Sequence, residues 1–528
     1  MQPSSGPEHP LRWTWPVDRR KPTVTHPRRL DVRRTRNAAS ARGVRAAAPL
    51  AAALLVAGGL TAWSLAPQEA FAATGRAAPE GDFNGDGYAD LVSGAPGATV
   101  SHKAQAGYVA VTYGSANGLV PSHKKLVSRS ASGVPGPAAA KQRFGETFSK
   151  GDLDGDGYSD LVIGAGKASS GSVILWGSPS GLTGGTPIAT YGQAPQVGDF
   201  DGDGKADLAL FGDPGSYGDD PMAQAANLWK GPISRTGSPA ARLNFLDKSE
   251  WFGYDDDAPG AECAKNDSCI SGPRSISGPV VAKATGDVNG DHRQDIVMWN
   301  YAGDGEWDNK VLLGGRTGFK EAAAPGVRGT VGVGDVDGDG YGDVVAGDNE
   351  DTGKVTVAYG TPSGPSATRT QSFDQSLPGF HGAQESGDRL GSCIAVADVT
   401  GDGRAEIALG ISGEDFSGLA DAGSIALLHG TASGVTGAGS QVLHQNTPGV
   451  PGVAEKNDAF GAACGLLDVN GDGHRDLAVS SAAENASSGA VWSLRGSGHG
   501  LTTKGATAFG PGDVGGPATK AEFGIFLR

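Results

Sequence analysis

The chain has 528 residues, more than one ordinary hydrophobic core accommodates, and its formal net charge at pH 7 is -15. Residues 1–72 carry +7, so the remainder carries -22, and an acidic body of this kind excludes nucleic acid as a partner. Glycine accounts for 87 residues, more than twice the usual share of about 7 %, which favours many short strands joined by tight turns. The composition therefore predicts an all-β fold.

Residues 1–72 have the composition of an export signal with a long basic n-region. Residues 1–45 are rich in Arg and Pro, an Ala-, Leu- and Val-rich run follows from about Ala46 to Ala66, and Ala70-Phe71-Ala72 ends the stretch. This order predicts a secretory signal peptide cleaved after Ala72. A transmembrane anchor is the alternative, which the weakly hydrophobic, Ala-rich run disfavours.

We therefore expect a secreted, extracellular protein with no membrane contact after cleavage. Two export routes stay open, because Arg33-Arg34 fits a twin-arginine signal and the true start could also lie downstream of Met1.

An acidic loop recurs seven times between residues 82 and 476. Its pattern is Asp-x-Asp/Asn-Gly-Asp-Gly-x-x-Asp, as in residues 152–160, with oxygen-bearing side chains at positions 1, 3, 5 and 9. That spacing suits a hard cation such as Ca²⁺, with the carbonyl of position 7 as a further ligand. A surface turn rich in Asp and Gly explains one isolated copy, but not seven copies that each lead into an apolar strand.

The sequence thus predicts structural calcium sites, up to seven in number. The candidate ligands, at positions 1, 3, 5, 7 and 9 of the successive loops, are Asp82, Asn84, Asp86, Tyr88, Asp90, Asp152, Asp154, Asp156, Tyr158, Asp160, Asp199, Asp201, Asp203, Lys205, Asp207, Asp287, Asn289, Asp291, Arg293, Asp295, Asp335, Asp337, Asp339, Tyr341, Asp343, Asp398, Thr400, Asp402, Arg404, Glu406, Asp468, Asn470, Asp472, His474 and Asp476.

Two of the seven loops depart from the pattern. His292 replaces the glycine at position 6 of the fourth loop, where the backbone must turn sharply, and Thr400 and Glu406 alter positions 3 and 9 of the sixth. We expect weaker binding there, and we expect the His292 and His474 side chains to be loop residues rather than ligands. An EF-hand is disfavoured, because Ile163 occupies position 12 of the second loop and a strand follows.

Each loop lies within a repeated unit of short strands. A large apolar residue and a Gly precede the loop in Phe144-Gly145, Tyr191-Gly192, Leu390-Gly391 and Phe460-Gly461, and two apolar strands follow it, the second ending in Gly. Successive loops begin 47 to 88 residues apart, which accommodates about four strands per unit. Residues 523–528 repeat the Phe-Gly strand without a further loop, whereas the first unit has Thr74-Gly75 there. We expect the C-terminal strand to complete the first unit.

The Phe-Gly strand, the acidic loop and Gly94-Ala95-Pro96 together resemble FG-GAP repeats, the units of the integrin alpha-chain N-terminal propeller and of many secreted bacterial proteins. The resemblance covers about residues 80–528. It implies a seven-bladed β-propeller over residues 73–528, closed by the C-terminal strand, with calcium loops on one face. Integrin ligand recognition is not implied, because the partner beta chain and the inserted metal-dependent domain have no counterpart here.

The four cysteines form two pairs along the sequence. Cys263 and Cys269 lie in an irregular segment and predict a small disulfide loop in an oxidising compartment. Cys393 and Cys464 occupy equivalent strands of successive repeats, so they form either a disulfide or two small buried hydrophobic sites. The second interpretation is slightly favoured.

The longest interval between loops holds an extra segment at about 213–280, which contains the stretch Trp251-Phe252-Gly253-Tyr254 beside three Asp residues. This stretch is the best candidate for a sugar-binding loop, although packing of the aromatic rings against the blade is favoured. We expect a monomeric binding or adhesion module for an extracellular glycan or protein. The alternative is an extracellular hydrolase or lyase acting on polysaccharide or ester substrates. No catalytic or organic-cofactor motif was identified, so enzymatic activity is disfavoured.

Overall fold

The computed structural model describes residues 81–164, 171–189, 193–212, 216–217, 220–221, 226–245, 280–303, 306–324, 329–348 and 353–528. The chain divides into units 1–73 and 74–528, and every described residue belongs to the second unit. The predicted signal peptide, the Cys263/Cys269 pair and the stretch around Trp251 therefore lie outside the described residues. Within the described part, no helix is long and apolar enough to cross a bilayer.

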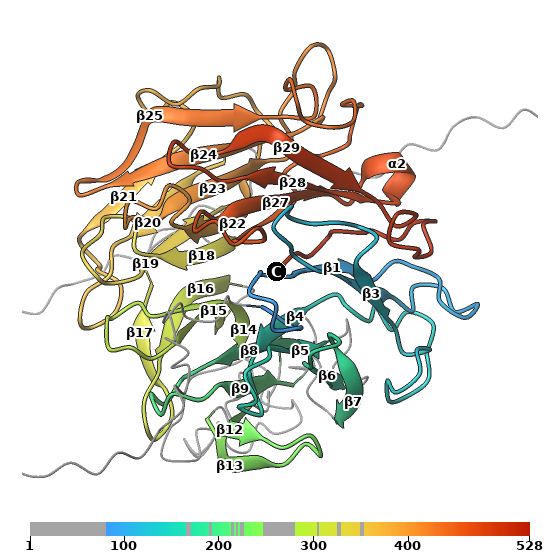
Figure 1. Cartoon of the computed structure of the whole chain (residues 1–528). Coiled ribbons are helices and arrows are strands. Elements are labelled where there is room, and N and C mark those ends of the chain that lie inside the picture. Colours follow the sequence, from blue (N-terminus) through green and yellow to red (C-terminus); the bar gives the residue numbers. More distant parts are fainter. Residues whose placement is uncertain are drawn as a thin grey trace, which may run out of the picture. The chain divides into compact units, whose positions relative to one another are not determined.

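Seven antiparallel sheets form a ring, so the predicted seven-bladed β-propeller is confirmed (Figure 1). The strands of blades one to four are β1 (Leu91–Ala95), β2 (Tyr108–Thr112), β3 (Lys124–Val127); β4 (Phe148–Gly151), β5 (Asp160–Ile163), β6 (Ser172–Trp176), β7 (Thr183–Ile188); β8 (Gln193–Gly198), β9 (Asp207–Phe211), β12 (Ala226–Ile233), β13 (Pro239–Asn244); and β14 (Val280–Gly286), β15 (Asp295–Gly303), β16 (Glu306–Leu313), β17 (Lys320–Ala323).

Blades five to seven repeat the same four-strand order. Their strands are β18 (Thr330–Gly334), β19 (Asp343–Gly347), β20 (Val355–Ala358), β21 (Thr370–Phe373); β22 (Leu390–Ala397), β23 (Glu406–Ile411), β24 (Ser424–Thr431), β25 (Gly434–Leu443); and β26 (Ala463–Leu467), β27 (Asp476–Ser481), β28 (Ala490–Arg495), β29 (Thr502–Phe509). A two-strand hairpin, β10 (Ser216–Tyr217) and β11 (Asp220–Pro221), interrupts blade three, and one helical turn, α2 (Glu484–Ser487), lies in blade seven.

The core of the propeller lies between the blades. The second strands β5, β9, β19, β23 and β27 are buried at every position, because each sheet packs a neighbouring sheet on both faces. The first strands of successive blades contact one another, as β4 does β8 and β22 does β26, and so form the inner ring. Each acidic loop leads into the second strand of its blade, which places all seven loops at the same end of the blades.

The C-terminal segment completes the first blade, as predicted. The Arg528 carbonyl accepts a hydrogen bond from the Val92 N–H at 2.8 Å, and the Phe526 carbonyl accepts one from the Gly94 N–H at 3.0 Å. Phe523 is fully buried in the apolar cluster that joins the first and last blades, together with Leu527. Figure 1 shows the chain end beside β1 at the middle of the ring. The first and last repeats are therefore held together by main-chain pairing and by apolar burial.

Cys393 and Cys464 form a disulfide, so the slightly favoured interpretation of two free buried thiols was wrong. The two residues lie on β22 and β26, the inner strands of blades six and seven, with a Cα–Cα distance of 5.8 Å. Inner strands converge toward the propeller axis, and this convergence brings equivalent positions of neighbouring blades within bonding reach. No free thiol occurs among the described residues.

Part of the predicted extra segment is ordinary blade structure. Residues 226–244 supply β12 and β13, the third and fourth strands of blade three, and β14 begins blade four at Val280. Residues 246–279, which include the aromatic stretch, lie outside the described residues, as do residues 213–215, 218–219 and 222–225.

Closure of the ring predicts the effect of removing the last strand. Deleting residues 522–528 should lower the melting temperature by roughly 10 °C or more, because it removes an inner strand and the burial of Phe523 and Leu527. Phe523→Ala should produce part of this loss, whereas Val453→Ala, at a 70 % exposed position, is the control. Thermal unfolding monitored by circular dichroism checks both, and an unchanged transition in the deletion variant would indicate an open array.

Candidate metal centres

Each acidic loop is organised around the carboxylate at position 1. In the first loop, Asp82 Oδ1 accepts a hydrogen bond from the Gly85 N–H at 2.6 Å, and Oδ2 accepts one from the Gly87 N–H at 2.9 Å. Both glycines have positive φ, 73° and 90°, a conformation that disfavours residues with a Cβ. The glycines at positions 4 and 6 thus let the backbone wrap around its first carboxylate.

The fourth loop achieves the same geometry without the second glycine. His292 occupies position 6 with φ 64°, and its N–H still donates to Asp287 Oδ2 at 2.8 Å. His292 thus adopts the left-handed backbone conformation that the turn requires, at a cost of about 1 kcal/mol for a residue with a Cβ.

Position 9 braces the loop against the rest of its blade. Asp160 is fully buried, and its two oxygens accept hydrogen bonds from the Leu153 N–H and the Gly177 N–H, both at 2.8 Å. The same pair of bonds holds Asp90, Asp207, Asp295 and Asp343. The hydrogen bond to position 9 brings the end of the third strand close to the loop, and this explains the glycine found there. A Cβ on Gly177 would lie 2.4 Å from the Ser159 carbonyl oxygen.

Burial controls the ionisation of these bracing carboxyl groups. Desolvation raises the pKa of Asp160 to about 7, against the lowering effect of its two main-chain hydrogen bonds, and the nearby Asp154 and Asp152 raise it further. Asp90, Asp207, Asp295, Asp343 and Asp476 have pKa values raised to about 7 by the same leading cause. A cation held in the loop would have the opposite effect, because it favours the ionised form.

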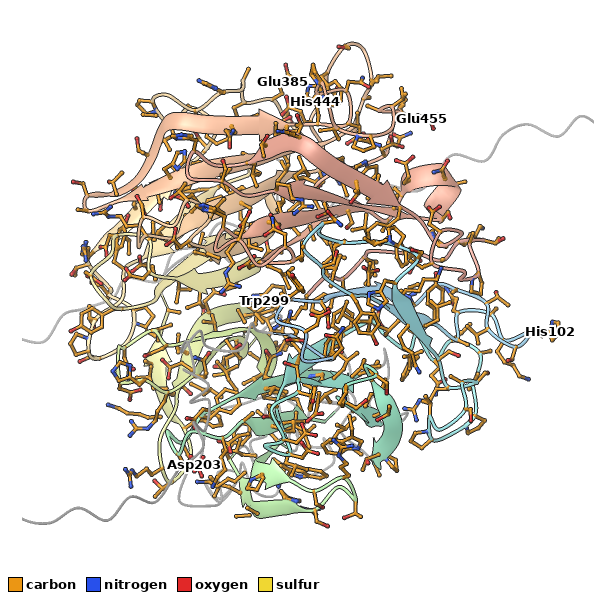
Figure 2. The ribbon with its side chains drawn as sticks, viewed as in Figure 1. His102, Asp203, Trp299, Glu385, His444 and Glu455 are labelled. Atoms are coloured by element: carbon orange, nitrogen blue, oxygen red, sulfur yellow. A yellow bond between two sulfur atoms is a disulfide. The ribbon has the colours of Figure 1, made fainter. Side chains whose placement is uncertain are left out.

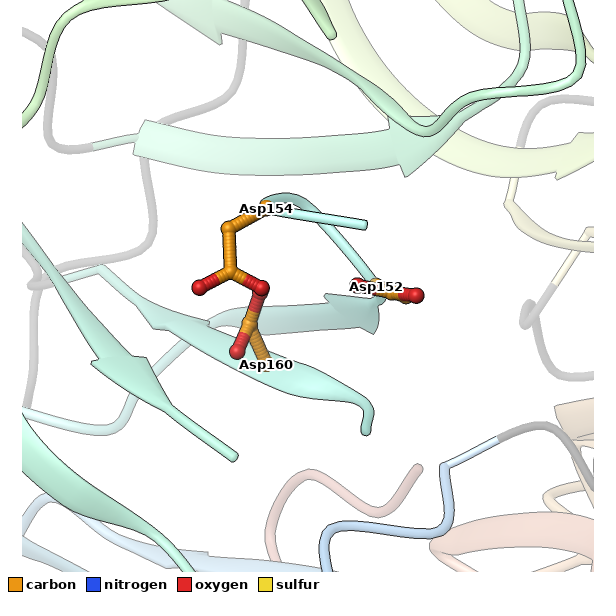
Figure 3. Close-up of side chains that lie close together, drawn as sticks. All are labelled: Asp152, Asp154 and Asp160. Carbon is orange, nitrogen blue, oxygen red and sulfur yellow. The ribbon is translucent and has the colours of Figure 1, made fainter. Parts of the chain in front are cut away.

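Three loops bring three carboxylates within ligand distance of one another. The clusters, in each of which the oxygens lie within 4.8 Å of each other, are Asp152, Asp154 and Asp160; Asp199, Asp201 and Asp203; and Asp335, Asp337 and Asp339. Figure 3 shows the carboxylates of Asp154 and Asp160 meeting, with Asp152 across the loop. In the first and seventh loops, Asn84 and Asn470 supply an amide at position 3 instead.

Two buried carboxylate oxygens bear on whether the loop residues fit a metal ion. Asp154 Oδ1 and Asp476 Oδ2 are buried without any hydrogen-bond partner in the described structure. A buried, unpaired carboxylate oxygen among other carboxylates is costly unless a cation neutralises it. The oxygen-only ligands of the loops therefore fit a hard divalent cation such as Ca²⁺.

Basic side chains lie against the outer carboxylates of the three clustered loops. Arg235 Nε contacts Asp154 Oδ2 and its Nη2 contacts Asp156 Oδ2, both at 2.6 Å, and Arg369 bridges Asp337 and Asp339 in the same way. In the third loop, Lys230 Nζ lies 2.5 Å from Asp201 Oδ2. These cations offset part of the repulsion that the carboxylates exert on one another.

The sixth loop has different hydrogen bonds at position 9. Glu406, at position 9, accepts hydrogen bonds from the Val399 and Thr400 N–H groups at 2.9 and 3.0 Å. Its longer side chain pairs with His429 Nδ1 at 3.2 Å, and this hydrogen bond raises the pKa of His429. Glu406 therefore still holds the loop to its blade, but its other carboxylate oxygen pairs with His429 and not with the glycine N–H that is used in the other loops.

The loops of neighbouring blades are bonded to each other at five of the seven blade junctions. The N–H of position 8 donates to the position-1 carbonyl of the preceding blade in Ser159 to Asp82, Gln294 to Asp199, Gly342 to Asp287, Ala405 to Asp335 and Ala89 to Asp468, at 2.8 to 3.1 Å. The position-7 side chain also covers the position-4 glycine of the preceding loop, as Tyr158 covers Gly85 and Tyr88 covers Gly471. His474 was predicted to be a loop residue and not a ligand. Its Nδ1 lies 3.1 Å from the Val399 carbonyl oxygen, so the side chain contacts the neighbouring blade.

Two buried carboxyl clusters that were not predicted from the sequence lie at the opposite end of the blades. In blade six, Gln375 Nε2 donates to Glu414 Oε2 at 3.3 Å, and the Glu385 N–H donates to Asp388 Oδ2 at 2.7 Å. Burial raises the pKa of Glu414 to about 7, and Asp388 raises it further. Gln375 and Asp388 lie in the segment that connects the outer strand of blade five to the inner strand of blade six, so these hydrogen bonds hold that segment in place.

Blade seven repeats this cluster with Gln445, Asp458 and Glu484. The Gln-to-Asp spacing is 13 residues and the Asp-to-Glu spacing is 26 residues in both blades. This identical spacing is the signal in the sequence that could have revealed the clusters. Figure 2 labels Glu385 and Glu455, which precede the two Asp residues by three positions.

Family models match four segments of the chain. The FG-GAP repeat matches residues 75–112, 391–428 and 460–494, which fall in blades one, six and seven. The FG-GAP-like repeat matches residues 152–210, from the second loop to β9. Each match includes at least one acidic loop and the strand that follows it.

Among curated proteins, the rat phosphatidylinositol-glycan-specific phospholipase D is 34 % identical over 116 residues, which is 21 % of this chain and 14 % of that protein. Integrin alpha-PS5 of Drosophila melanogaster is 36 % identical over 103 residues, or 19 % of this chain and 9 % of that protein. The chain thus matches only a small part of the length of these relatives.

Among solved structures, AofleA from Arthrobotrys oligospora aligns with 72 % of this chain and 92 % of its own, at a TM-score of 0.35 and 9 % identity. That score supports no inference. The repeats, the homology to integrin alpha chains and the ring of seven blades together identify the chain as a β-propeller that contains FG-GAP repeats.

Proposed function

We propose that this chain is a secreted, calcium-stabilised propeller that binds an extracellular glycan or protein. The observation that carries the proposal is the ring of acidic loops at one end of the blades, in which main-chain hydrogen bonds join neighbouring loops at five of the seven blade junctions. That ring rigidifies the scaffold and leaves the hairpins at the opposite end free to present a ligand-binding surface. Binding surfaces on a rigid scaffold are commonly built from such loops.

Calcium is the cation that the loops suit. Positions 1, 3 and 5 would contribute side-chain oxygens, with the carbonyl of position 7 and the carboxylate of position 9 as further ligands. Each site with free Ca²⁺ at ten times its dissociation constant would stabilise the fold by about 1.4 kcal/mol. Because neighbouring loops are bonded, calcium in one loop would also hold the next blade.

The calcium proposal is tested by counting bound ions. Equilibrium dialysis against CaCl₂ with elemental analysis should show several Ca²⁺ per chain, and Asp154→Asn should lose one of them. Asp308→Asn, which removes an exposed carboxylate on β16 outside any loop, is the matched control and should lose none. EDTA should lower the melting temperature by many degrees. A protein that binds no Ca²⁺, or whose unfolding is insensitive to chelator, contradicts the proposal.

Secretion is supported by the disulfide between Cys393 and Cys464. Disulfides between inner strands persist in oxidising compartments and are rare in reducing ones. This agrees with the export signal that residues 1–72 predict.

The hairpins opposite the acidic loops supply the candidate binding surface. Phe416 and His444, from the hairpin of blade six and the segment leading to blade seven, stack with ring centroids 4.2 Å apart. Both side chains are partly exposed, and Glu385 lies in the same region (Figure 2). An aromatic face beside hydrogen-bonding groups suits a sugar ring or a peptide side chain.

The binding role is tested on the calcium-loaded full chain. A glycan array, followed by a panel of extracellular-matrix proteins, should identify a retained ligand, and Phe416→Ala with His444→Ala should reduce its affinity roughly tenfold. Val453→Ala, at an exposed position of the same end, should leave binding unchanged. Product analysis of each hit separates binding from turnover. Turnover, or the absence of any ligand, would contradict a binding module.

The phospholipase activity in the name of the rat relative is not proposed for this chain. The matched region is only 14 % of that protein, so the activity of the whole relative carries no argument for this chain.

A further inference from the structure

The two buried carboxyl clusters lie at the same end of the blades as the candidate binding surface. Each cluster joins the segment that enters a blade, which supplies a Gln and an Asp, to the turn after the second strand of that blade, which supplies a Glu. The members are Gln375, Asp388 and Glu414 in blade six, and Gln445, Asp458 and Glu484 in blade seven. The clusters therefore fix the entering segments, residues 374–389 and 444–462, to the turns of their blades.

The clusters contain more buried acceptors than donors. Gln375 Nε2 donates to Glu414 Oε2 at 3.3 Å and to the Ala383 carbonyl oxygen at 3.2 Å, which accounts for both of its hydrogens. Gln375 Oε1 and Gln445 Oε1 are buried and have no hydrogen-bond partner in the part of the chain that the structure describes. A proton on one carboxyl group of each cluster would supply a further donor.

Acidic groups surround Glu414 in blade six. The titratable side chains that act on it are those of Asp388, Glu385 and Asp415. Arg389 follows Asp388 in the chain, but its Nη2 pairs with Asp421 Oδ1 at 3.1 Å. No ion pair within the described ranges neutralises Glu414 or Asp388.

Glu484 in blade seven has a similar environment. Its oxygens accept hydrogen bonds from Gln445 Nε2 at 2.9 Å and Asn485 Nδ2 at 3.1 Å, and the titratable side chains that act on it are those of Asp458 and Glu455. Lys456 is exposed, and no described basic side chain forms an ion pair with Glu484 or Asp458. Both clusters thus consist of carboxyl groups and amides without a cation.

Two buried carboxyl groups in one cluster ionise together only at a large cost in free energy. Burial raises the pKa of Glu414 to about 7, and repulsion from Asp388 raises it further. Burial and repulsion from Asp458 likewise raise the pKa of Glu484. A carboxyl group whose pKa is higher in the closed cluster than in an open one stabilises the closed form in acid. This stabilisation is lost progressively as the pH rises through about 7.

Each ring of the aromatic pair on the candidate binding surface adjoins one cluster. Phe416 follows Glu414 by two residues, and His444 directly precedes Gln445. The rings stack with centroids 4.2 Å apart, and burial lowers the pKa of His444, so its imidazole is neutral where Glu414 titrates. Figure 2 labels His444 together with Glu385 and Glu455 at this end of the blades. Movement of the turn or of the entering segment would therefore separate the two rings.

We propose that the two carboxyl clusters form a pH-sensitive switch for the candidate binding surface. A proton on each cluster keeps the entering segments fixed to the turns and keeps Phe416 stacked on His444. When both carboxyl groups of a cluster are ionised, their repulsion releases the segment and the aromatic pair. Mildly acidic pH therefore favours binding of the glycan or protein ligand. This regulatory role rests on the proposed binding function, whereas the switch itself exists without a ligand.

Amide hydrogen exchange of the calcium-loaded full chain measures the switch directly. The probes are the Glu385 and Glu455 amides, which donate to Asp388 Oδ2 and Asp458 Oδ2, both at 2.7 Å. After correction for the intrinsic effect of pH on exchange, their protection should be about tenfold higher at pH 6 than at pH 8, as one carboxyl group that titrates near pH 7 predicts. Saturating calcium favours the ionised carboxylates of the acidic loops at both pH values.

The two clusters serve as controls for each other. Glu414→Gln, which is uncharged at either pH, should give the Glu385 amide equal protection at pH 6 and pH 8, while the Glu455 amide keeps its pH dependence. Glu484→Gln should have the reverse effect. Asp308→Asn, at an exposed position on β16, should leave both pH dependences unchanged, and circular dichroism verifies that each variant is folded.

The switch is overturned if both amides are equally protected at the two pH values in the parent chain, or if the pH dependence persists in the variant that lacks the corresponding Glu. For a ligand found in the binding screen, affinity should fall up to about tenfold from pH 6 to pH 8 in the parent and less than about twofold in the double variant. Equal parent affinity at both pH values contradicts the regulatory role. If no ligand is found, the proposed binding function fails, and the exchange of the two amides still decides whether the switch exists.

Discussion

The structure depends on one repeated main-chain hydrogen bond, from position 8 of an acidic loop to the position-1 carbonyl of the loop in the preceding blade. Ser159 donates to Asp82 in this way, Ala89 joins the first blade to the last by donating to Asp468, and five of the seven blade junctions carry the bond. The residue that accepts the bond also carries the carboxylate around which its own loop is wrapped. The shape of each loop and the attachment of the next blade are therefore set by the same residue.

This arrangement concentrates negative charge at one end of the blades. The acidic loops gather at one end of the blades, where Arg235, Arg369 and Lys230 offset part of their repulsion and buried oxygens such as Asp154 Oδ1 remain unpaired. A cation held in the loops would relieve this local excess of negative charge.

Much of the fold could be predicted from the sequence, because the repeat is local. The loop pattern and the apolar strands that follow it predicted seven blades, and Phe523-Gly524 at the chain end predicted closure. The disulfide between Cys393 and Cys464 was judged wrongly, because the distance between equivalent strands depends on the convergence of the ring.

The candidate site was less predictable, because it depends on contacts between strands that are distant in the sequence. The acidic residues were visible in the sequence, but the bracing role of Asp160 involves Gly177 on the third strand. The Arg528 side chain donates to the Lys283 carbonyl oxygen, although the two residues are 245 positions apart and share no motif. Contacts of this kind are set by the closed ring and leave no local pattern.

The most direct test of the linked ring is amide hydrogen exchange of the native protein at single-residue resolution, with and without calcium. The amides of Ser159, Gln294, Gly342, Ala405 and Ala89 are the interblade donors. If calcium holds the ring, chelation should accelerate exchange at these amides together, while amides within the buried strand β23 remain protected. Exchange at the interblade amides that is the same in both conditions would contradict the account.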